Sequence, residues 1–322
     1  MIYFMKYHIT IGEYRVNTLR SVSVKRSVEQ LSDTAVITLP GTLINQPLEV
    51  NDKINVGDPV RIELGYDGYM NEEFTGYVKR INTDDTEIRI ECEDELYLWE
   101  VAVKDKQYDG SLRPVTLKTI LQDLAKQVNG KYAIECDFDF SYSKFTIQAA
   151  TALDVLRKIQ DETKANIYFE GTTLHIHPLY GNGSWSGNTV KYDLAQNVVS
   201  ANLQYKKAGD QKLKVEISYK NIKGESKNIS YGEGSKVIKR TVNTNDPESL
   251  NAIAKNEYNL WCYDGYEGDL TGWLIPFCQP TDKVEIIDKS KQYKNGTYYV
   301  IATDVSFSES GGRRKVTIGR KV

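Results

Sequence analysis

One short pattern occurs near both ends of this sequence, and it limits the folds that the chain can adopt. The first copy runs from Gly57 to Ile81. In it, apolar residues alternate with charged ones, and a second extended run follows a polar loop. This alternation predicts an antiparallel hairpin with one buried face. The residues that mark this copy are Asp58, Val60, Ile62, Thr75, Tyr77 and Val78.

The second copy starts at Thr281 and ends near residue 305. The six marker residues recur in the same order, with a loop two residues shorter, as Asp282, Val284, Ile286, Thr297, Tyr299 and Val300. Strand alternation alone could supply the Val-x-Ile part, so the succession of strand, polar loop and Thr-x-Tyr-Val carries the inference. We therefore expect an internal duplication, with both hairpins placing their Val and Ile side chains in a core.

The composition is that of a globular protein rich in strand-forming residues. Hydrophobic residues occupy 40% of the 322 positions, and 22 residues are tyrosine. A chain of this length favours two or three domains. The formal net charge of -3 argues against a protein that holds a nucleic-acid backbone, which needs clustered cations. The basic runs at 206–207 and 313–315 are interpreted as solvated strand ends.

The four cysteines are widely spaced and form no CxxC pattern, so neither a disulfide framework nor a zinc site is predicted. They fit a reducing compartment. The N-terminus lacks the basic head, apolar run and cleavage site of a signal peptide. No stretch of roughly 20 apolar residues could span a bilayer. The expectation is a soluble protein that is cytoplasmic when made.

Three segments have helical rather than strand periodicity. Apolar residues at helical spacing follow Thr116 and predict a first helix. A second helix opens at Thr151, with Asp154 in the capping-box position. A third helix is predicted to begin at Asp246, a capping residue, with Pro247 in its first position.

These patterns divide the chain into three expected domains. Residues 1–100 form a first β-barrel domain, residues 101–182 an α/β domain, and residues 183–322 a second β-barrel domain with one helix at about 247–264. A connector rich in Gly, Ser and Asn at 181–189 precedes the last domain. The predicted fold class is therefore mainly β with an α+β insert, in which two related small barrels flank an α/β domain.

The histidines are the strongest candidates for a metal site. His175 and His177 stand two apart on a predicted strand, which directs both rings to one face. Two ligands are too few for a metal, and the remaining histidine is His8. We interpret the pair as part of a plain strand with partly exposed rings.

Other catalytic patterns are weaker. The segment GSWSG places Trp185 where a nucleophile elbow requires serine, so it is interpreted as a linker. Alternation along a strand would put Glu91, Glu93 and Glu95, which flank Asp94, on one solvated face. No catalytic, cofactor-binding or metal residues are predicted, and an enzyme is not expected.

The succession of segments resembles a known family. The residues that carry the resemblance are VGDPVRIELGYDG, FTGYVKRI, LKTILQDLAKQVNG, TALDVLRKIQDETKANIYFEGTTLHI, KVEIID and TYYVIATDVSFSESGGRRKVTIG. In this order they are similar to phage baseplate hub proteins of the late control protein D and Mu-like tail hub family. They are also similar to the N-terminal hub part of type VI secretion spike proteins. Residues 185–245 match only as a strand pattern.

The resemblance implies a structural role at the end of a contractile tail. It implies a homotrimeric ring with pseudo-sixfold symmetry, since three chains with two barrels each present six similar units. The implied partners are the tail spike protein, the tail tube and other baseplate proteins, without a sequence-specific nucleic acid. The implied location is the virion tail baseplate, assembled in the bacterial host cytoplasm. Because the chain ends at Val322 after its last strand, the spike is expected to be a separate partner.

A second class of function stays open from the residues alone. A carbohydrate-binding or other β-rich binding module would explain the many Tyr and Trp residues. It predicts a planar group of aromatic side chains on one β face and gives no reason for the internal copy.

Overall fold

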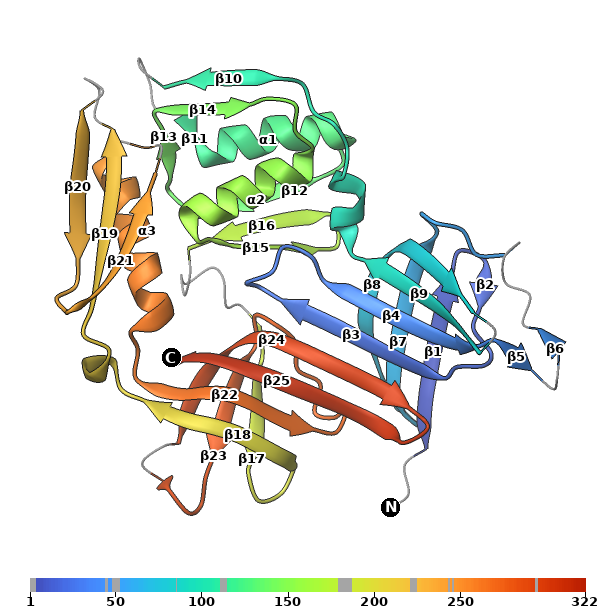
Figure 1. The fold of residues 1–322 in the computed structure, drawn as a ribbon. Helices are drawn as coiled ribbons and strands as arrows, with labels where there is room; N and C mark the ends of the chain where they lie inside the picture. Colours follow the sequence, from blue (N-terminus) through green and yellow to red (C-terminus); the bar gives the residue numbers. More distant parts are fainter. Residues whose placement is uncertain are drawn as a thin grey trace.

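The computed structural model describes the whole chain except residues 1–3, 44–45, 48–52, 85, 111–114, 179–186, 221–224, 243, 245 and 293–294. Figure 1 shows an α/β part at the top and two β-rich parts below it. The described residues contain many more strands than helices, and the predicted mainly β fold class with an α+β insert is confirmed. Trp185 lies outside the described residues, as does most of the connector at 181–189.

The first β-rich part, here called the first β module, consists of antiparallel strands in the order β1-β7-β8-β9-β4-β3. Small apolar and β-branched residues alternate along each strand and fill one buried cluster. The strand bounds are β1 (Met5–Ile11), β3 (Ser21–Ser27), β4 (Thr34–Pro40), β7 (Pro59–Tyr66), β8 (Tyr69–Thr83) and β9 (Glu87–Glu93). The shorter strands are β2 (Tyr14–Arg15), β5 (Thr42–Leu43) and β6 (Gln46–Pro47).

The α/β part holds two helices, α1 (Leu117–Val128) and α2 (Ala152–Thr163). Thr151 starts α2 with a complete capping box, because its hydroxyl and the Asp154 carboxylate each accept the other residue's backbone N–H. The remaining elements are η1 (Glu95–Trp99), β10 (Lys106–Asp109), β11 (Val115–Thr116), β12 (Ala133–Cys136), β13 (Ser141–Tyr142), β14 (Lys144–Ile147), β15 (Asn166–Glu170) and β16 (Thr173–His177).

The second β-rich part, here called the second β module, has the strand order β17-β23-β24-β25-β22-β18. Its strands are β17 (Thr189–Asp193), β18 (Val198–Lys206), β22 (Gly265–Gly272), β23 (Lys283–Ile287), β24 (Gly296–Ser308) and β25 (Gly311–Lys321). Strand β24 also pairs with β3, so the two modules share one continuous sheet.

Between β18 and β22 the chain leaves the second module and forms a small layer. Its elements are η3 (Ala208–Asp210), β19 (Leu213–Lys220), β20 (Ser226–Tyr231), β21 (Lys236–Thr241) and α3 (Pro247–Trp261). Asp246 caps α3 through the Ser249 N–H. Buried side chains of β19 and α3, such as Val215 and Ile253, belong to the same apolar cluster as those of α1 and α2.

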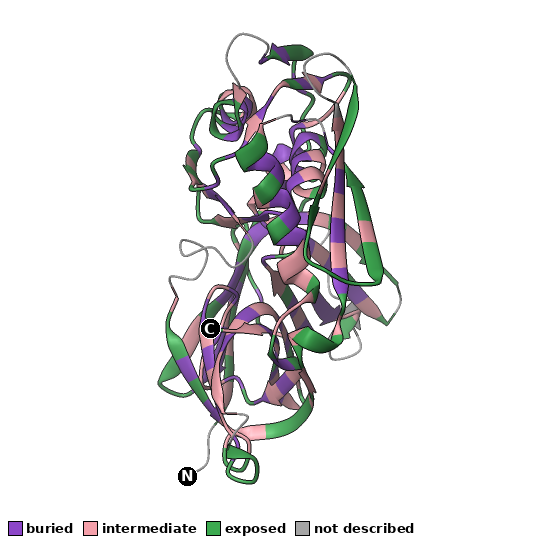
Figure 2. Cartoon of the chain, turned by 90° about the vertical axis from the view of Figure 1, so that its left-hand side faces the viewer, coloured by how far each residue is buried: buried purple, intermediate pink, exposed green. Residues whose placement is uncertain are grey.

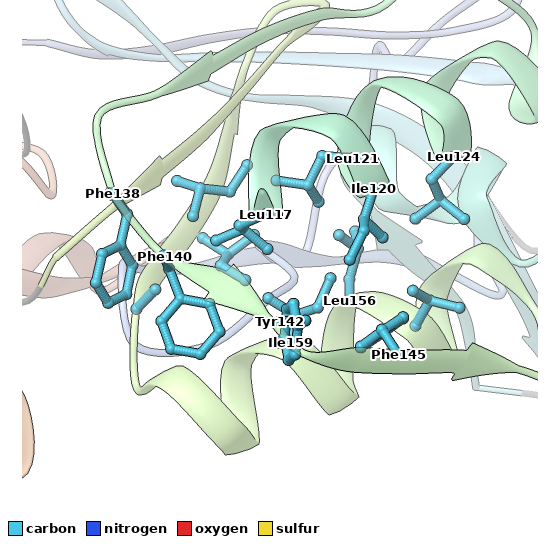
Figure 3. Packing of buried hydrophobic residues seen from close by; sticks show 14 of the residues in the cluster. Leu117, Ile120, Leu121, Leu124, Phe138, Phe140, Tyr142, Phe145, Leu156 and Ile159 are labelled. Carbon is cyan, nitrogen blue, oxygen red and sulfur yellow. The ribbon is translucent and has the colours of Figure 1, made fainter. Parts of the chain in front are cut away.

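The core of the α/β part is rich in leucine and aromatic residues. Figure 3 shows Leu117, Ile120 and Leu124 along α1, facing Leu156 and Ile159 of α2. The helical spacing of these residues places them on one face of each helix. Figure 2 shows the result, with buried and exposed positions alternating along the helices.

Candidate assembly site

The first marker hairpin is the antiparallel pair β7 and β8. Pro59 lies opposite Tyr77, and Ile62 lies opposite Phe74. At the start of the hairpin the Val78 N–H donates to the Asp58 carbonyl, at 2.9 Å.

The second marker hairpin, β23 and β24, has the same register. The four cross-strand pairs Pro59/Tyr77, Val60/Gly76, Arg61/Thr75 and Ile62/Phe74 correspond in sequence to Lys283/Tyr299, Val284/Tyr298, Glu285/Thr297 and Ile286/Gly296. The bond from the Val300 N–H to the Asp282 carbonyl, at 3.0 Å, matches the bond at Asp58. Because a slip of one residue would turn every side chain to the other face, equal register means equal buried positions.

The turn before each hairpin is also the same. The Asn55 N–H donates to Asp58 Oδ2 at 2.7 Å, and the Gln279 N–H donates to Asp282 Oδ2 at 2.9 Å. In both turns the residue before the aspartate has a left-handed backbone. In the first copy it is Gly57, with φ +92°, and in the second it is Thr281, with φ +78°. The aspartate at each marker position therefore fixes a turn that a glycine or a strained residue completes.

The aspartate of the second copy is buried. Burial raises the pKa of Asp282, while N–H bonds from Gln279 and Asn188 act in the opposite direction. These bonds hold the carboxylate in place at the start of β23.

The structural match extends beyond the hairpins. Paired in chain order, the strands β1, β3, β4, β7, β8 and β9 correspond to β17, β18, β22, β23, β24 and β25, and each strand has the corresponding neighbours. A bulge interrupts the pairing of β8 with β9 between Val78 and Arg80, and another lies between Val300 and Ala302 in β24. One difference is that β1 runs antiparallel to β7, whereas β17 runs parallel to β23.

The marker residues divide by their burial. The buried ones are Val60, Ile62, Val78, Asp282, Val284, Ile286 and Val300. Those at intermediate or exposed positions are Asp58, Thr75, Tyr77, Thr297 and Tyr299. The apolar members thus stabilise each hairpin from inside, while the polar and aromatic members other than the buried Asp282 lie at its surface.

The two modules are joined by strand pairing between β3 and the C-terminal half of β24. The register runs antiparallel from Ala302 opposite Ser27 to Ser308 opposite Ser21. Val305 and Phe307 of β24 are buried in the apolar cluster of the first module. The core of the first module is therefore completed by side chains of the second.

A buried ion pair crosses the same joint. Arg314 Nη2 of β25 donates to Glu73 Oε1 of β8 at 2.6 Å, and both side chains are only 1% exposed. Arg314 Nη1 also donates to the Cys278 carbonyl at 2.9 Å. The interpretation of residues 313–315 as solvated strand ends is therefore wrong for Arg314. Glu73 is the extra residue of a bulge in β8, which turns its side chain inward. A bulge position has no signal in the sequence.

The acidic run at 91–95 is not a solvated strand face. Glu93 and Asp94 are buried, and Glu95 already belongs to η1. Glu93 accepts a bond from Lys79 Nζ at 2.6 Å. Asp94 caps η1 and accepts the backbone N–H groups of Leu96 and Asp33. The run therefore lies at the end of the first module, where Glu93 pairs with Lys79 and Asp94 caps η1. Strand alternation alone does not predict these contacts.

Asp94 has an unusual protonation equilibrium. Burial raises its pKa to about 8, with a smaller contribution from the neighbouring Asp33 carboxylate. Burial also raises the pKa of Asp33, and Arg26 opposes that shift. Arg26 donates to Asp33 Oδ2 and to Gln279 Oε1, both at 3.0 Å. The Arg26 side chain therefore links β3 to the turn before the second marker hairpin.

The histidine pair does lie together on β16, with ring centroids 5.6 Å apart. The predicted partial exposure is wrong, because both rings are buried. His177 Nδ1 lies 2.6 Å from Asp137 Oδ1, and the His175 ring stacks on Tyr168 at 5.0 Å. Burial lowers the pKa of His175, and Glu135 opposes this. These contacts give the rings a packing and hydrogen-bonding role.

No group of three or more His, Cys, Asp or Glu among the described residues is arranged to hold a metal ion. Within the same part of the chain, no helix is long and apolar enough to cross a membrane. Exposed large aromatics of the described residues lie on separate elements, with Phe4 before β1, Tyr69 on β8, Tyr231 on β20, Trp261 on α3 and Trp273 after β22. A planar group on one β face, which a carbohydrate-binding module would need, is not formed by these five.

Comparison with known proteins gives structural matches only. No family model matches the sequence, and no curated protein does. The 43 kDa tail protein of prophage MuSo2 from Shewanella oneidensis is 15% identical, with a TM-score of 0.68 over 98% of both chains. The tail protein from Neisseria meningitidis MC58 is 14% identical, with a TM-score of 0.68 over 98% of this chain and 96% of that one.

A third solved structure comes from a secretion system. An E. coli component of the type VI secretion system, described as similar to the phage T4 tail proteins gp27 and gp5, is 7% identical. Its TM-score is 0.62 over 98% of this chain and 77% of that chain. This chain therefore has the fold of phage tail and type VI secretion proteins. The resemblance to phage tail and type VI secretion proteins, drawn from the sequence, is confirmed at the level of the fold.

Proposed function

We propose that this chain is a structural hub protein in the baseplate of a contractile phage tail or a related injection system. Three copies form a ring that joins a sixfold tail tube to a threefold spike. The shared fold with two tail proteins, one of them from a prophage, and with a type VI secretion component supports this class of function.

The observation that carries the proposal is the match between the two β modules. Each has six strands in corresponding order, and the hairpin register is equal at four successive pairs. A trimer of such chains presents six similar modules around one axis, which is the arrangement that a sixfold partner requires. A monomeric binding module would have no use for this repetition.

We assign the two modules to an internal duplication in which each copy forms a small barrel. The proposed domains are residues 1–100, 101–182 and 183–322. Within the last of these, residues 207–262 form an excursion whose strand β19 and helix α3 pack on the α/β domain. The twelve marker residues then act as structural elements of the repeat, and no catalytic role is assigned to any of them.

The partners of the ring follow from its position. One face meets the tail tube and other baseplate proteins, and the other carries the spike. The shared fold with an E. coli secretion component that is itself described as similar to the phage T4 tail proteins gp27 and gp5 supports a place in such an assembly. The proposed location is the tail baseplate of the virion, after assembly in the host cytoplasm.

The test is the oligomeric state of the purified chain. Size-exclusion chromatography with light scattering should give three times the chain mass of 36.6 kDa, and negative-stain images should show rings with six similar units. A dimer or tetramer that persists at high protein concentration would contradict the ring. If the chain is monomeric, the measurement is repeated with the spike partner, because assembly depends on mass action. A monomer in both conditions would refute the proposal.

A further inference from the structure

The joint between the two modules uses two specific strand edges. One edge is β3 of the first module, and the other is the half of β24 that follows its bulge. Seven successive residue pairs connect them, from Ala302/Ser27 to Ser308/Ser21. This joint is heterologous, since it connects two different edges, so it can in principle be repeated from chain to chain.

Each module also has the edge that the other module uses in this joint. The counterpart of β3 is β18, and the counterpart of β24 is β8. In the described part of the chain, β18 pairs only with β22, and Arg80–Thr83 of β8 pair only with β9. Figure 1 shows β18 at the outer rim of the second module. An unpaired strand edge presents N–H and C=O groups that another strand can bind.

Because the two modules have equal register, the residue pairs between β3 and β24 predict which residues would face each other if β18 and β8 paired. When the cross-strand pairs are followed from β24 through β25 and β22, and from β8 through β9 and β4, Ser200–Lys206 of β18 occupy the positions equivalent to Ser21–Ser27 of β3. Arg80–Thr83 of β8 likewise occupy the positions equivalent to Ala302–Val305 of β24. The expected cross-strand pairs are therefore Arg80/Lys206, Ile81/Tyr205, Asn82/Gln204 and Thr83/Leu203.

The chemistry of these pairs fits an antiparallel contact. Ile81 is a half-buried residue packed on the core of the first module, and Leu203 and Tyr205 are packed on the core of the second. Pairing would extend both cores across the contact and bury these side chains further. On the opposite face, the exposed amides of Asn82 and Gln204 would lie side by side.

The one pair of like charges has acidic neighbours on both sides. Lys206 Nζ lies 3.2 Å from Glu267 Oε2, and Arg80 Nη1 lies 4.0 Å from Glu91 Oε2. These carboxylates offset the repulsion that two cations on facing strands would otherwise cause. The neutral pair Asn82/Gln204 takes the position of Asp304/Lys25 in the internal joint.

We propose that β18 of one copy of this chain pairs with Arg80–Thr83 of β8 in a second copy, and that this contact closes the ring. The proposal rests on the proposed hub function and names the surface through which the copies meet. The contact repeats between chains what β3 and β24 form within a chain, so all six joints of a trimer become similar.

Cross-linking of paired cysteines tests the contact. The background carries Ser at Cys136 and Cys262, which are partly exposed, while Cys92 and Cys278 are buried. In this background, Asn82→Cys combined with Gln204→Cys is treated with a mild oxidant or a short bifunctional thiol reagent. Denaturing gels without reductant should show covalent dimers and closed trimers. Each single variant should stay monomeric on the same gels, because the contact joins unlike edges.

The matched control combines Asn82→Cys with Ser200→Cys, which moves one thiol four residues, or about 13 Å, along the strand. It should cross-link far less. Efficient cross-linking of this control, or dimers from Asn82→Cys alone, would overturn the proposed edge pairing. Light scattering on the same samples separates the two proposals. A trimer without the 82–204 cross-link refutes the contact and leaves the ring, whereas a chain that stays monomeric, with or without the spike partner, refutes the hub function itself.

Discussion

The Glu73 and Arg314 pair is a deeply buried ionic contact between the two modules, with both side chains 1% exposed. Replacing Glu73 by Ala would leave the arginine charge buried without its counter-charge. We predict that Glu73→Ala lowers the free energy of unfolding by about 3–5 kcal/mol, the usual cost of breaking a buried pair. Urea denaturation followed by circular dichroism measures this change.

The neighbouring Glu72 provides a matched control. Its carboxylate pairs with Arg61, and both side chains are about half exposed. Solvent screens such a pair, so Glu72→Ala should change stability little. Equal losses from the two variants would show that Arg314 does not depend on Glu73.

Asp94 predicts a pH dependence of stability. Its pKa is raised to about 8 in the folded protein by burial and by Asp33, above the ordinary value of the unfolded chain. The folded state then binds more protons than the unfolded state between roughly pH 4 and pH 8, so this group makes the protein less stable as pH rises through that window. The free energy of unfolding of Asp94→Asn, relative to that of the wild type, should therefore be higher at pH 8.5 than at pH 5. Urea denaturation at both pH values measures this difference.

Asp84 is the control for the pH experiment. It is exposed and also accepts backbone N–H groups, and the Thr86 hydroxyl is the main cause of its lowered pKa. A lowered pKa lies outside the window tested, so Asp84→Asn should leave the pH dependence unchanged. If Asp94→Asn follows the wild type in parallel at both pH values, the raised pKa is refuted.

Residue-level prediction from the sequence succeeded where a local pattern decides the position. The Val and Ile of both marker hairpins alternate with polar residues, and they are buried. It failed for His175, His177 and Arg314, which are buried because distant groups supply their partners. Glu73 lies 241 positions from Arg314 in the chain, and no local pattern indicates such a pair.

At the scale of elements, the two marker turns allow a paired test. Gly57 and Thr281 both have left-handed backbone, which costs a non-glycine residue roughly 1–2 kcal/mol. A Cβ on Gly57 would meet only the Tyr97 hydroxyl, at 3.5 Å, so the backbone and not crowding sets the cost. We predict that Gly57→Thr destabilises the protein and that Thr281→Gly stabilises it, each by about 1 kcal/mol. Thermal and urea denaturation of both variants give the two signs.

The two changes serve as controls for each other, because each makes one turn resemble the other. Changes of the same sign in both variants would show that the turns are not equivalent. A stabilising Thr281→Gly would also show that the second copy retains strain at this position, which the glycine of the first copy avoids.

Elements with strong local signals were predictable. The expected helix starts at Thr151 and Asp246 agree with the caps of α2 and α3, because capping and helical periodicity act within a few residues. The packing of β19 and α3 on the α/β part was not predictable. Both have an apolar face, but nothing in the sequence identifies which distant surface covers it.

At the scale of the whole molecule, the two modules share structure rather than merely lying on one chain. Strand β24 pairs with β23 and β25 in its own module and with β3 in the other. Phe307 near its end is 5% exposed, and its ring meets Tyr7 of β1 edge to face at 5.9 Å. A change in the position of β24 therefore changes the packing of the first module's core as well as that of the second.

Because the modules share a core, a substitution in the second module should change hydrogen exchange in the first. Phe307→Ala removes a second-module ring from the first module's core and should cost about 3–5 kcal/mol. Hydrogen exchange should then rise in β1, Met5–Ile11, as well as in β24, because the amides of β1 lose the packing that covers them. The control is Leu270→Ala on β22, a buried residue of the second module's own cluster, which should raise exchange in β22 and β25 more than in β1. If Phe307→Ala leaves β1 unchanged, the modules are independent domains, and a ring built from them would need rigidity from its partners instead of from the joint at β3 and β24.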